Sequence, residues 1–406
     1  MIRYHAAWIL PISEPPIRDG WFAVDRGRVV ALGAAGKRVL ADGAQVVDLG
    51  DVAVMPGLVN AHTHLELSYL RDEVAPASQF VTWVRDVMKA RRERPDPGGR
   101  EILDAVDAAL IEAVACGTAI VGDISNTLVS FEPLTRSSLA AVVFYELIRF
   151  NTPDPAGVVA RALAELEALH PTEHVRASLA AHAPYSVAPL VLRAIRQAVN
   201  DSAFAPCSIH LSESVEEVEF IRSGGGPWRD LLEELGSWDP AWVAPGGTPV
   251  QFLDDSGFLD GRLLAVHGVQ MTTADLDRLV ARGTTLVTCP RSNGPTGAGA
   301  PPIEDFYNYG VNVAVGTDSL ASAPDLNVFA ELATMRALAP TVSAGALLDS
   351  ATRQGARALG FDADYGTIEP GKSGRLLAVS VPPATEDVEE YLVGGIEPSQ
   401  LRWLEP

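Results

Sequence analysis

Three features of the sequence predict an α/β protein, a (β/α)8 TIM barrel with a small flanking β-sandwich. First, eight apolar runs rich in β-favouring residues follow one another between residues 52 and 317. Second, most of these runs are followed by enough residues for a crossover helix, which implies parallel strands. Third, both ends of the chain hold short strand-like runs that are too small to fold alone. With 406 residues and 47% hydrophobic content, the chain can form one large domain with a minor one attached.

The expected barrel strands are apolar runs bounded by turn residues. They lie at Val52–His64, Thr118–Ile124, Ala140–Ile148, Arg176–Ala183, Pro206–Leu211, Arg262–Val269, Thr285–Pro290 and Asn312–Thr317. Between them, apolar residues recur every three or four positions over Ile102–Val114 and Val159–Leu169, which predicts helices. Two further helices are expected from Pro324 to Leu332 and from Val342 to Leu359.

The two ends of the chain are expected to pair into one β-sandwich. Their strand-like runs lie at Gly20–Val24, Arg28–Leu32, Gln45–Asp48 and within Gly366–Val379. We therefore predict that residues 1–54 and 363–406 form the sandwich and that residues 55–362 form the barrel. A long connection, Ser212–Gly261, interrupts the alternation. Because such connections form the active face of a barrel, it serves either the active site or a contact between subunits.

Composition limits the partners and the location. The net charge of −21 argues against nucleic acid or an anionic membrane as the main partner, because both would be repelled at long range. A few local arginines still allow a small anionic substrate. Cys116, Cys207 and Cys289 lie far apart and form no Cys-x-x-Cys pair, which favours a reducing compartment. The sequence shows no cleavable signal and no long apolar span, so we expect a soluble cytoplasmic protein.

The segment Pro56–His64 ends an apolar run with two histidines separated by one residue. On a β-strand this spacing points His62 and His64 to the same face, where both can bind one metal ion. Taken alone, the pair is equally consistent with histidines that make ordinary hydrogen bonds.

Residues at other strand ends favour the metal site. His210, His267 and Asp318 each end an apolar run, and a barrel brings the C-terminal ends of its strands to one rim. The set His62, His64, His210 and Asp318 offers three nitrogens and one oxygen, which suits one divalent ion, Zn²⁺ or Fe²⁺, better than Mg²⁺ or Ca²⁺. Such an ion lowers the pKa of bound water from about 15.7 to roughly 7.

Glu213 lies three residues after His210, just beyond the expected end of the strand. It can reach the bound water or a ring nitrogen of a substrate without binding the metal, so we expect it to transfer protons. The alternative for an isolated glutamate in such a loop is a solvated residue at a helix N-terminus.

As an ordered set, the motifs resemble those of the amidohydrolase superfamily, in the branch of cytosine, guanine and adenosine-type deaminases. They are Pro-Gly-Leu-Val-Asn-Ala-His-Thr-His at 56–64, His-Ala-Pro-Tyr-Ser at 182–186, His-Leu-Ser-Glu at 210–213, Val-His-Gly at 266–268, Arg-Ser-Asn at 291–293, Gly-Thr-Asp-Ser at 316–319 and Leu-Asn-Val-Phe at 326–329. The resemblance covers nearly the whole chain. It implies a metal-dependent hydrolytic deaminase, in which metal hydroxide attacks an amidine-like ring carbon and ammonia leaves.

The same resemblance implies roles for single residues. The metal ligands are then His62, His64, His210 and Asp318; the proton-transfer residues are Glu213, His267 and Asp318. His182 contacts the substrate ring.

Within that branch, the sequence is most similar to the aminodeoxyfutalosine deaminases. These act in menaquinone synthesis on an adenine nucleoside that bears a carboxyphenyl group, so the expected partner is a small nucleoside-like substrate. Glu66 and Trp83 are then candidate substrate contacts. Either Arg149 or Arg291 pairs with the carboxylate.

Other functions stay open at this stage. Glu146 could complete a binuclear site with His267, which would give an amide-bond hydrolase, although no lysine on that strand or the next is available for carbamylation. A guanine, cytosine or triazine-type deaminase or chlorohydrolase is a second alternative. A non-catalytic binding protein is a third, and the intact set of proton-transfer and ligand residues disfavours it. The resemblance also makes a homodimer the expected assembly.

Overall fold

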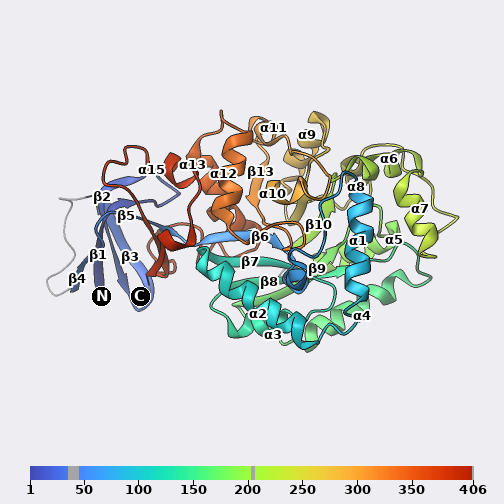
Figure 1. Ribbon diagram of the computed structural model, residues 1–406, viewed down its shortest axis with the longest axis horizontal. Helices are drawn as coiled ribbons and strands as arrows, with labels where there is room; N and C mark the ends of the chain where they lie inside the picture. Colours follow the sequence, from blue (N-terminus) through green and yellow to red (C-terminus); the bar gives the residue numbers. More distant parts are fainter. Residues whose placement is uncertain (35–44, 203–205, 405–406) are drawn as a thin grey trace.

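The computed structural model describes residues 1–34, 45–202 and 206–404, which form a barrel and a separate sheet (Figure 1). The barrel consists of eight parallel strands surrounded by helices. The separate sheet is built from both ends of the chain and lies at one end of the molecule. The predicted α/β class, with a (β/α)8 barrel and a flanking β-structure from the termini, is confirmed.

The barrel strands lie side by side in chain order, and neighbours pair in parallel. They are β6 (Leu58–Thr63), β7 (Thr118–Ser125), β8 (Ala140–Leu147), β9 (Val175–Ala181), β10 (Cys207–Leu211), β11 (Leu263–His267), β12 (Thr285–Thr288) and β13 (Asn312–Val315). Each overlaps one of the eight predicted runs. The backbone N–H groups of Thr317 and Asp318 donate to the carbonyl oxygen of His62 at 3.1 and 3.0 Å, which joins the end of β13 to β6.

Helical segments connect the strands and cover the barrel. They are η1 (Leu65–Leu70), α1 (Phe80–Arg92), α2 (Arg100–Ala115), α3 (Phe131–Arg136), α4 (Pro155–Ala168), α5 (Pro189–Asp201), α6 (Val215–Ser223), α7 (Pro227–Glu234), α8 (Pro249–Asp255), α9 (Thr273–Arg282), α10 (Pro290–Asn293), α11 (Ile303–Asn308), α12 (Val328–Leu338), α13 (Ala344–Asp349), η2 (Ser350–Gln354) and α14 (Gly355–Ala358). Helix α12 begins four residues later than the Pro324 expected, because the Asn327 side chain caps it by accepting from the backbone N–H of Phe329. No described helix is long and apolar enough to cross a membrane.

The separate sheet contains β1 (Ile2–Ile9), β2 (Ile17–Asp25), β3 (Arg28–Ala34), β4 (Gln45–Asp48), β5 (Val52–Pro56), β14 (Leu376–Ser380) and β15 (Leu401–Leu404). Its order is β15-β14-β5-β1-β2-β3, and β4 also pairs with β1. Two short helical segments, α15 (Val388–Leu392) and η3 (Pro398–Gln400), lie between β14 and β15.

The run Val52–His64, expected as one strand, is two strands that belong to different sheets. Gly57 separates β5 from β6 at a point of close packing. A Cβ atom at Gly57 would lie 2.5 Å from the Cβ atom of Ala119 and 2.6 Å from the ring of Trp403. Glycine is therefore required where the chain passes from the terminal sheet into the barrel.

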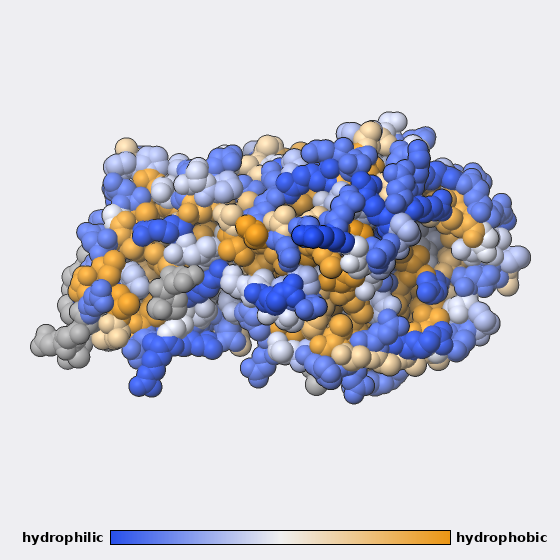
Figure 2. Space-filling model, turned by 60° about the horizontal axis from the view of Figure 1, so that its bottom comes forward, coloured by the Kyte–Doolittle hydropathy of each residue, from blue (hydrophilic) through white to orange (hydrophobic). Residues whose placement is uncertain are grey.

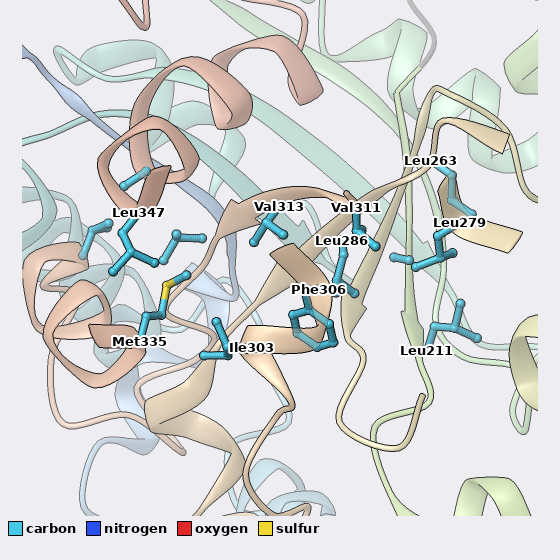
Figure 3. Close-up of a cluster of buried hydrophobic side chains, with 14 of the residues drawn as sticks. Leu211, Leu263, Leu279, Leu286, Ile303, Phe306, Val311, Val313, Met335 and Leu347 are labelled. Atoms are coloured by element: carbon cyan, nitrogen blue, oxygen red, sulfur yellow. The ribbon is translucent and has the colours of Figure 1, made fainter. Parts of the chain in front are cut away.

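Apolar side chains fill the space between the barrel strands and the helices outside them. Figure 3 shows part of this core, where Leu263 and Leu286 of neighbouring strands lie near Leu279 of α9 and Phe306 of α11. The long connection after β10 folds into α6, α7 and α8 rather than into an irregular loop. Helices α1 and α7 lie at the end of the molecule opposite the terminal sheet (Figure 1).

Candidate functional site

The C-terminal ends of the barrel strands bring histidines and one aspartate together. The ring centroid of His62, on β6, lies 4.9 Å from that of His64 and 5.0 Å from that of His210 at the end of β10. Asp318, which follows β13, places Oδ1 3.5 Å from His64 Nε2 and 3.7 Å from His62 Nε2. The His-x-His spacing therefore directs both rings toward one carboxylate oxygen.

The residues present fit a metal ion. Both ring nitrogens of His62 are buried and make no hydrogen bond within the described part of the chain. Because unsatisfied buried polar groups are costly, such a ring calls for a ligand. His210 has Nδ1 2.8 Å from the carbonyl oxygen of His182, so a proton on Nδ1 leaves Nε2 free for a metal. Ligand atoms of His62, His64 and Asp318 lie within 4.8 Å of one another, as do those of His62, His210 and His267.

The protonation states also suit a metal. Burial lowers the pKa of His62 to about 4 and the pKa values of His64 and His267 to about 3, so all three rings are neutral at pH 7. Neutral imidazole is the form that binds metals. Burial opposes ionisation of Asp318, but the neighbouring imidazoles outweigh it and hold the pKa of Asp318 well below its usual value. The cluster thus offers neutral nitrogens and an ionised oxygen.

Asp318 is held in place by its neighbours. Its Oδ2 accepts hydrogen bonds from the hydroxyl groups of Ser292 and Ser322, and its Oδ1 accepts from the backbone N–H of Ser319 at 2.7 Å. The residue has a φ of 60°, a left-handed conformation that is uncommon outside glycine. Strain of this kind persists where the surroundings hold a side chain in one orientation.

Glu213 and His267 form a second pair beside the cluster. Glu213 Oε1 lies 3.5 Å from His267 Nε2, and His267 Nδ1 lies 2.9 Å from the amide oxygen of Asn293. That contact favours a proton on Nδ1, so Nε2 can accept. Burial raises the pKa of Glu213 well above its usual value, and the negative charges of Asp318 and Glu217 raise it further. Both effects favour the protonated form of Glu213.

Glu217 supports Glu213 in a way that the sequence did not reveal. Its carboxylate accepts the backbone N–H groups of Ser212 at 2.9 Å and Glu213 at 2.8 Å. The only signal in the sequence is an acidic residue in the first turn of a helix, which is common at any helix start.

A cavity of about 630 Å³ opens onto this cluster. His64, His210, Glu213, His267 and Asp318 line one part of it, and aromatic and aliphatic side chains of α1 and α7 line another. In Figure 2, hydrophobic residues gather in a hollow that is surrounded by hydrophilic ones, toward the end of the molecule opposite the terminal sheet. The cavity is large enough for a nucleoside with a substituent.

Three of the five predicted substrate contacts lie in the cavity wall: Trp83, Arg149 and His182. The indole N–H of Trp83 is buried and lacks an acceptor among the described residues. Arg149 donates to the carbonyl oxygen of Ile148 at 2.7 Å and is otherwise exposed. His182 Nδ1 lies 2.6 Å from Ser186 Oγ, which leaves Nε2 for a ligand.

Glu66 and Arg291 lie outside the cavity wall. The Glu66 carboxylate already accepts from the hydroxyl groups of Ser125 and Thr127 and from two backbone N–H groups of the loop after β7. Arg291 makes a two-pronged ion pair with Asp325 at 2.7 and 2.9 Å. Both charged groups are satisfied within the protein, and the structure therefore does not place them as substrate contacts.

Glu146 lies beside the cluster but does not form a possible metal-binding group with His267 among the described residues. Its Oε1 lies 3.5 Å from His210 Nδ1, and its ligand atoms group with those of His182 and His210. Asn126, which sequence reasoning missed, donates to Glu146 Oε2 at 2.7 Å.

Comparisons with known proteins agree with this geometry. Residues 53–396 match the model of the amidohydrolase family. The chain is 30% identical over 404 residues to a 5-methylthioadenosine/S-adenosylhomocysteine deaminase of Moorella thermoacetica, covering 95% of this chain and 88% of that protein. It is 32% identical over 317 residues to an aminodeoxyfutalosine deaminase of Deinococcus radiodurans, covering 76% and 73%. Among solved structures, an adenosine deaminase of Xanthomonas campestris with bound zinc superposes with a TM-score of 0.83 and 28% identity, covering 98% and 90%.

Proposed function

We infer the reaction of this chain from its relatives. The chain belongs to the amidohydrolase family and is a hydrolase that acts on carbon–nitrogen bonds. Its similarity to deaminases of adenine-type compounds supports a metal-dependent deaminase of such a compound. We propose that the substrate is 6-amino-6-deoxyfutalosine and that the reaction serves menaquinone biosynthesis. The observation that carries this proposal is the cavity, which joins the histidine and aspartate cluster to an aromatic wall and an exposed guanidinium group.

The proposed metal ligands are His62, His64, His210 and Asp318. Zinc is favoured over iron because a similar adenosine deaminase contains zinc, although the donor set accepts both metals. When bound, a divalent ion of this kind supplies hydroxide at neutral pH.

The remaining residues would move and hold protons. Glu213, whose protonated form is favoured by burial, would donate a proton to the ring nitrogen beside the carbon that carries the amino group. His267, with its Nδ1 proton held by Asn293, orients the attacking water through Nε2. Asp318 would accept one proton from that water and transfer it to the amino group, which leaves as ammonia. The second water proton would return to Glu213 as the carbonyl group forms. His182 contacts the purine ring from the cavity wall.

The aromatic part of the cavity wall suits an aromatic substituent. Tyr185 and Trp228 stack with ring centroids 3.7 Å apart, and both line the cavity. Trp83 and Trp228 each present a buried indole N–H that has no acceptor within the described ranges. Arg149 would pair with a carboxylate on the same substituent.

The second candidate substrates are 5′-methylthioadenosine and S-adenosylhomocysteine. They are favoured by the relative that matches 95% of this chain. The two candidates differ in the group attached to the sugar, so the reaction at the adenine ring is the same for both.

A panel of substrates tests the proposal. Purified, metal-loaded protein is mixed with 6-amino-6-deoxyfutalosine, 5′-methylthioadenosine, S-adenosylhomocysteine or adenosine, and ammonia release and the change in adenine absorbance are followed. We expect the highest kcat/KM for 6-amino-6-deoxyfutalosine. Arg149→Met should lower that value about 10–100-fold and leave adenosine nearly unchanged, because one charged hydrogen-bonded contact contributes about 1.5–3 kcal/mol.

Two outcomes would contradict the proposal. The same assay is repeated with guanine, cytosine, a triazine and an amide, and turnover of one of these alone would overturn the nucleoside assignment. An equal loss on all four substrates in Arg149→Met would remove Arg149 as the carboxylate partner. Arg291→Met is the matched control, since its guanidinium group lies outside the cavity wall and should not distinguish among the substrates.

We also propose a cytoplasmic location, a homodimer and domain limits at 1–54, 55–362 and 363–406. All three cysteines are buried and free, which suits a reducing compartment. The first limit falls inside β5, which belongs to the terminal sheet and ends at Pro56, shortly before β6 begins the barrel at Leu58. Light scattering on the purified protein tests the dimer.

A further inference from the structure

Glu146 has a carboxylate oxygen that the proposed reaction does not use. The residue lies on β8, is 5% exposed and lines the cavity. Its Oε2 accepts from Asn126 Nδ2 at 2.7 Å, whereas its Oε1 is buried and has no hydrogen-bond partner in the described structure. Leaving a buried carboxylate oxygen unpaired is costly, so a donor on a ligand would stabilise it.

The neighbours of Glu146 fix its orientation but leave Oε1 available. Arg91 donates to Asn126 Oδ1 at 3.0 Å, and Asn126 in turn donates to Glu146. This chain of contacts holds Oε2 on the side of α1. His210 Nδ1 lies 3.5 Å from Oε1, but its proton is directed to the carbonyl oxygen of His182 at 2.8 Å. No neighbouring side chain in the described ranges therefore donates to Oε1.

The chemistry of an adenine nucleoside limits which donor can reach this oxygen. The ring nitrogens N1, N3 and N7 are acceptors in the neutral base and would repel a carboxylate. The exocyclic amino group donates, but the proposed reaction places it at Glu213 and Asp318. The hydroxyl groups of the ribose are the donors that are left.

We propose that Glu146 binds the ribose of the substrate, with Oε1 accepting a hydrogen bond from the 2′- or 3′-hydroxyl group. This inference rests on the proposed function, since it requires a nucleoside whose amino group faces Glu213. Glu146 thereby becomes a specificity residue that favours ribonucleosides over deoxyribonucleosides, and not a ligand of a second metal. A site built to bond a hydroxyl group rejects an analogue that lacks it, because its own polar atom is then left unpaired.

The test compares sugars in the wild type and in Glu146→Gln. The substrate is the adenine nucleoside that the wild type turns over fastest in the panel above, used with its 2′-deoxy and 3′-deoxy forms. The wild type should prefer the ribonucleoside over at least one deoxy form by about 10–100-fold in kcat/KM, the range of one charged hydrogen bond. In Glu146→Gln the preference should fall to within about 3-fold, mainly through a loss on the ribonucleoside.

Glu216→Gln is the matched control. Glu216 is also a buried glutamate with one unpartnered carboxylate oxygen, but it does not line the cavity. Any loss in this variant should be the same for all three sugars. Metal content measured on every variant should be one ion per chain and unchanged in Glu146→Gln.

Three outcomes would overturn the inference, and they have different meanings. An unchanged sugar preference in Glu146→Gln removes Glu146 from ribose binding while the deaminase assignment stands. Two ions per chain in the wild type and one in Glu146→Gln would make Glu146 a metal ligand and favour the binuclear hydrolase. Absence of turnover on every nucleoside in the wild type would overturn the proposed function and, with it, this inference.

Discussion

Glu213 combines a buried carboxyl group with a position beside the cluster, and burial raises its pKa well above the usual value, which favours the protonated form. We predict that Glu213→Gln retains one metal ion per chain and loses about 10²–10⁴-fold in kcat, the usual contribution of a positioned acid. The glutamine keeps the size of the side chain but has no proton to deliver. Metal analysis and ammonia release measure the two quantities. Turnover close to that of the wild type would exclude Glu213 from proton transfer.

The residues that meet at the strand ends could be predicted, whereas the orientation of the arginines could not. His62, His210 and Asp318 each end an apolar run, and a barrel makes all such ends neighbours. Arg149 and Arg291 both follow a strand as well, so spacing does not distinguish them. Their difference arises from Asp325, which binds Arg291 from another loop. Such a pairing depends on packing between distant segments and leaves no local pattern in the sequence.

At the level of elements, the end of β7 is tied to the start of η1 through Asp123. The buried Asp123 carboxylate accepts from the backbone N–H of Leu65 at 2.8 Å and from the hydroxyl group of Ser130. Burial raises the pKa of Asp123 to about 7, and its hydrogen bonds only partly offset this effect. Leu65 follows His64 directly, so this contact also supports the histidine pair.

The raised pKa predicts how Asp123→Asn changes stability with pH. Between about pH 4 and pH 7 the folded protein binds a proton at Asp123 that the unfolded chain has released, so this group makes the wild type less stable as the pH rises. Asparagine accepts from Leu65, can donate to Ser130 and does not titrate. The free energy of unfolding of Asp123→Asn, relative to the wild type, should therefore increase from pH 4 to pH 8, by at most about 1.4 kcal/mol for each unit of pKa shift. Urea unfolding at both pH values measures it, and a constant difference would contradict the pKa shift.

The strands with clear apolar runs were predictable, and the elements that depend on tertiary contacts were not. The barrel strands and the helices around Ile102–Val114 and Val159–Leu169 have strong local patterns. Strand β1 is half-exposed and β15 has four residues, so neither has a clear period. Pro56-Gly57 is a turn signal in the sequence, but the close contact with Ala119 and Trp403 that requires glycine there comes from residues far along the chain.

For the whole molecule, the class of fold followed from the order of strands and helices, but the contact between the two sheets did not. Trp403 of β15 packs against the barrel, and its indole N–H donates to the carbonyl oxygen of Val114 at 2.9 Å. The Arg375 guanidinium group lies over the ring of Trp403, 4.0 Å from its centroid. One side chain thus joins the terminal sheet to the barrel at the end away from the cavity.

We predict that Trp403→Ala destabilises the protein by about 2–4 kcal/mol without changing kcat. The loss arises from the packing of the half-buried ring, and the reacting residues lie at the opposite ends of the barrel strands. Trp403→Phe serves as the control, since it keeps an aromatic ring, although a smaller one, and loses the indole hydrogen bond, which alone contributes about 1 kcal/mol. Thermal unfolding and steady-state kinetics measure the two effects. A fall in kcat parallel to the fall in stability would show that the terminal sheet shapes the active site.

Removal of the metal should destabilise the barrel at the C-terminal ends of its strands, where the proposed ligands lie. The proposed ligands come from β6, β10 and the segment after β13, so a bound ion would link strands that are distant in sequence. Removal of the ion would leave the buried ring nitrogens of His62 without partners. Ligand binding at 100 times Kd contributes about 2.7 kcal/mol to stability. We therefore expect a chelator to abolish ammonia release and lower Tm, and added zinc or iron to restore both. Because the proposed metal ligands and Trp403 lie at opposite ends of the barrel, the losses of stability from chelation and from Trp403→Ala should add. Full removal of the ion with an unchanged Tm would contradict a metal bound by these residues.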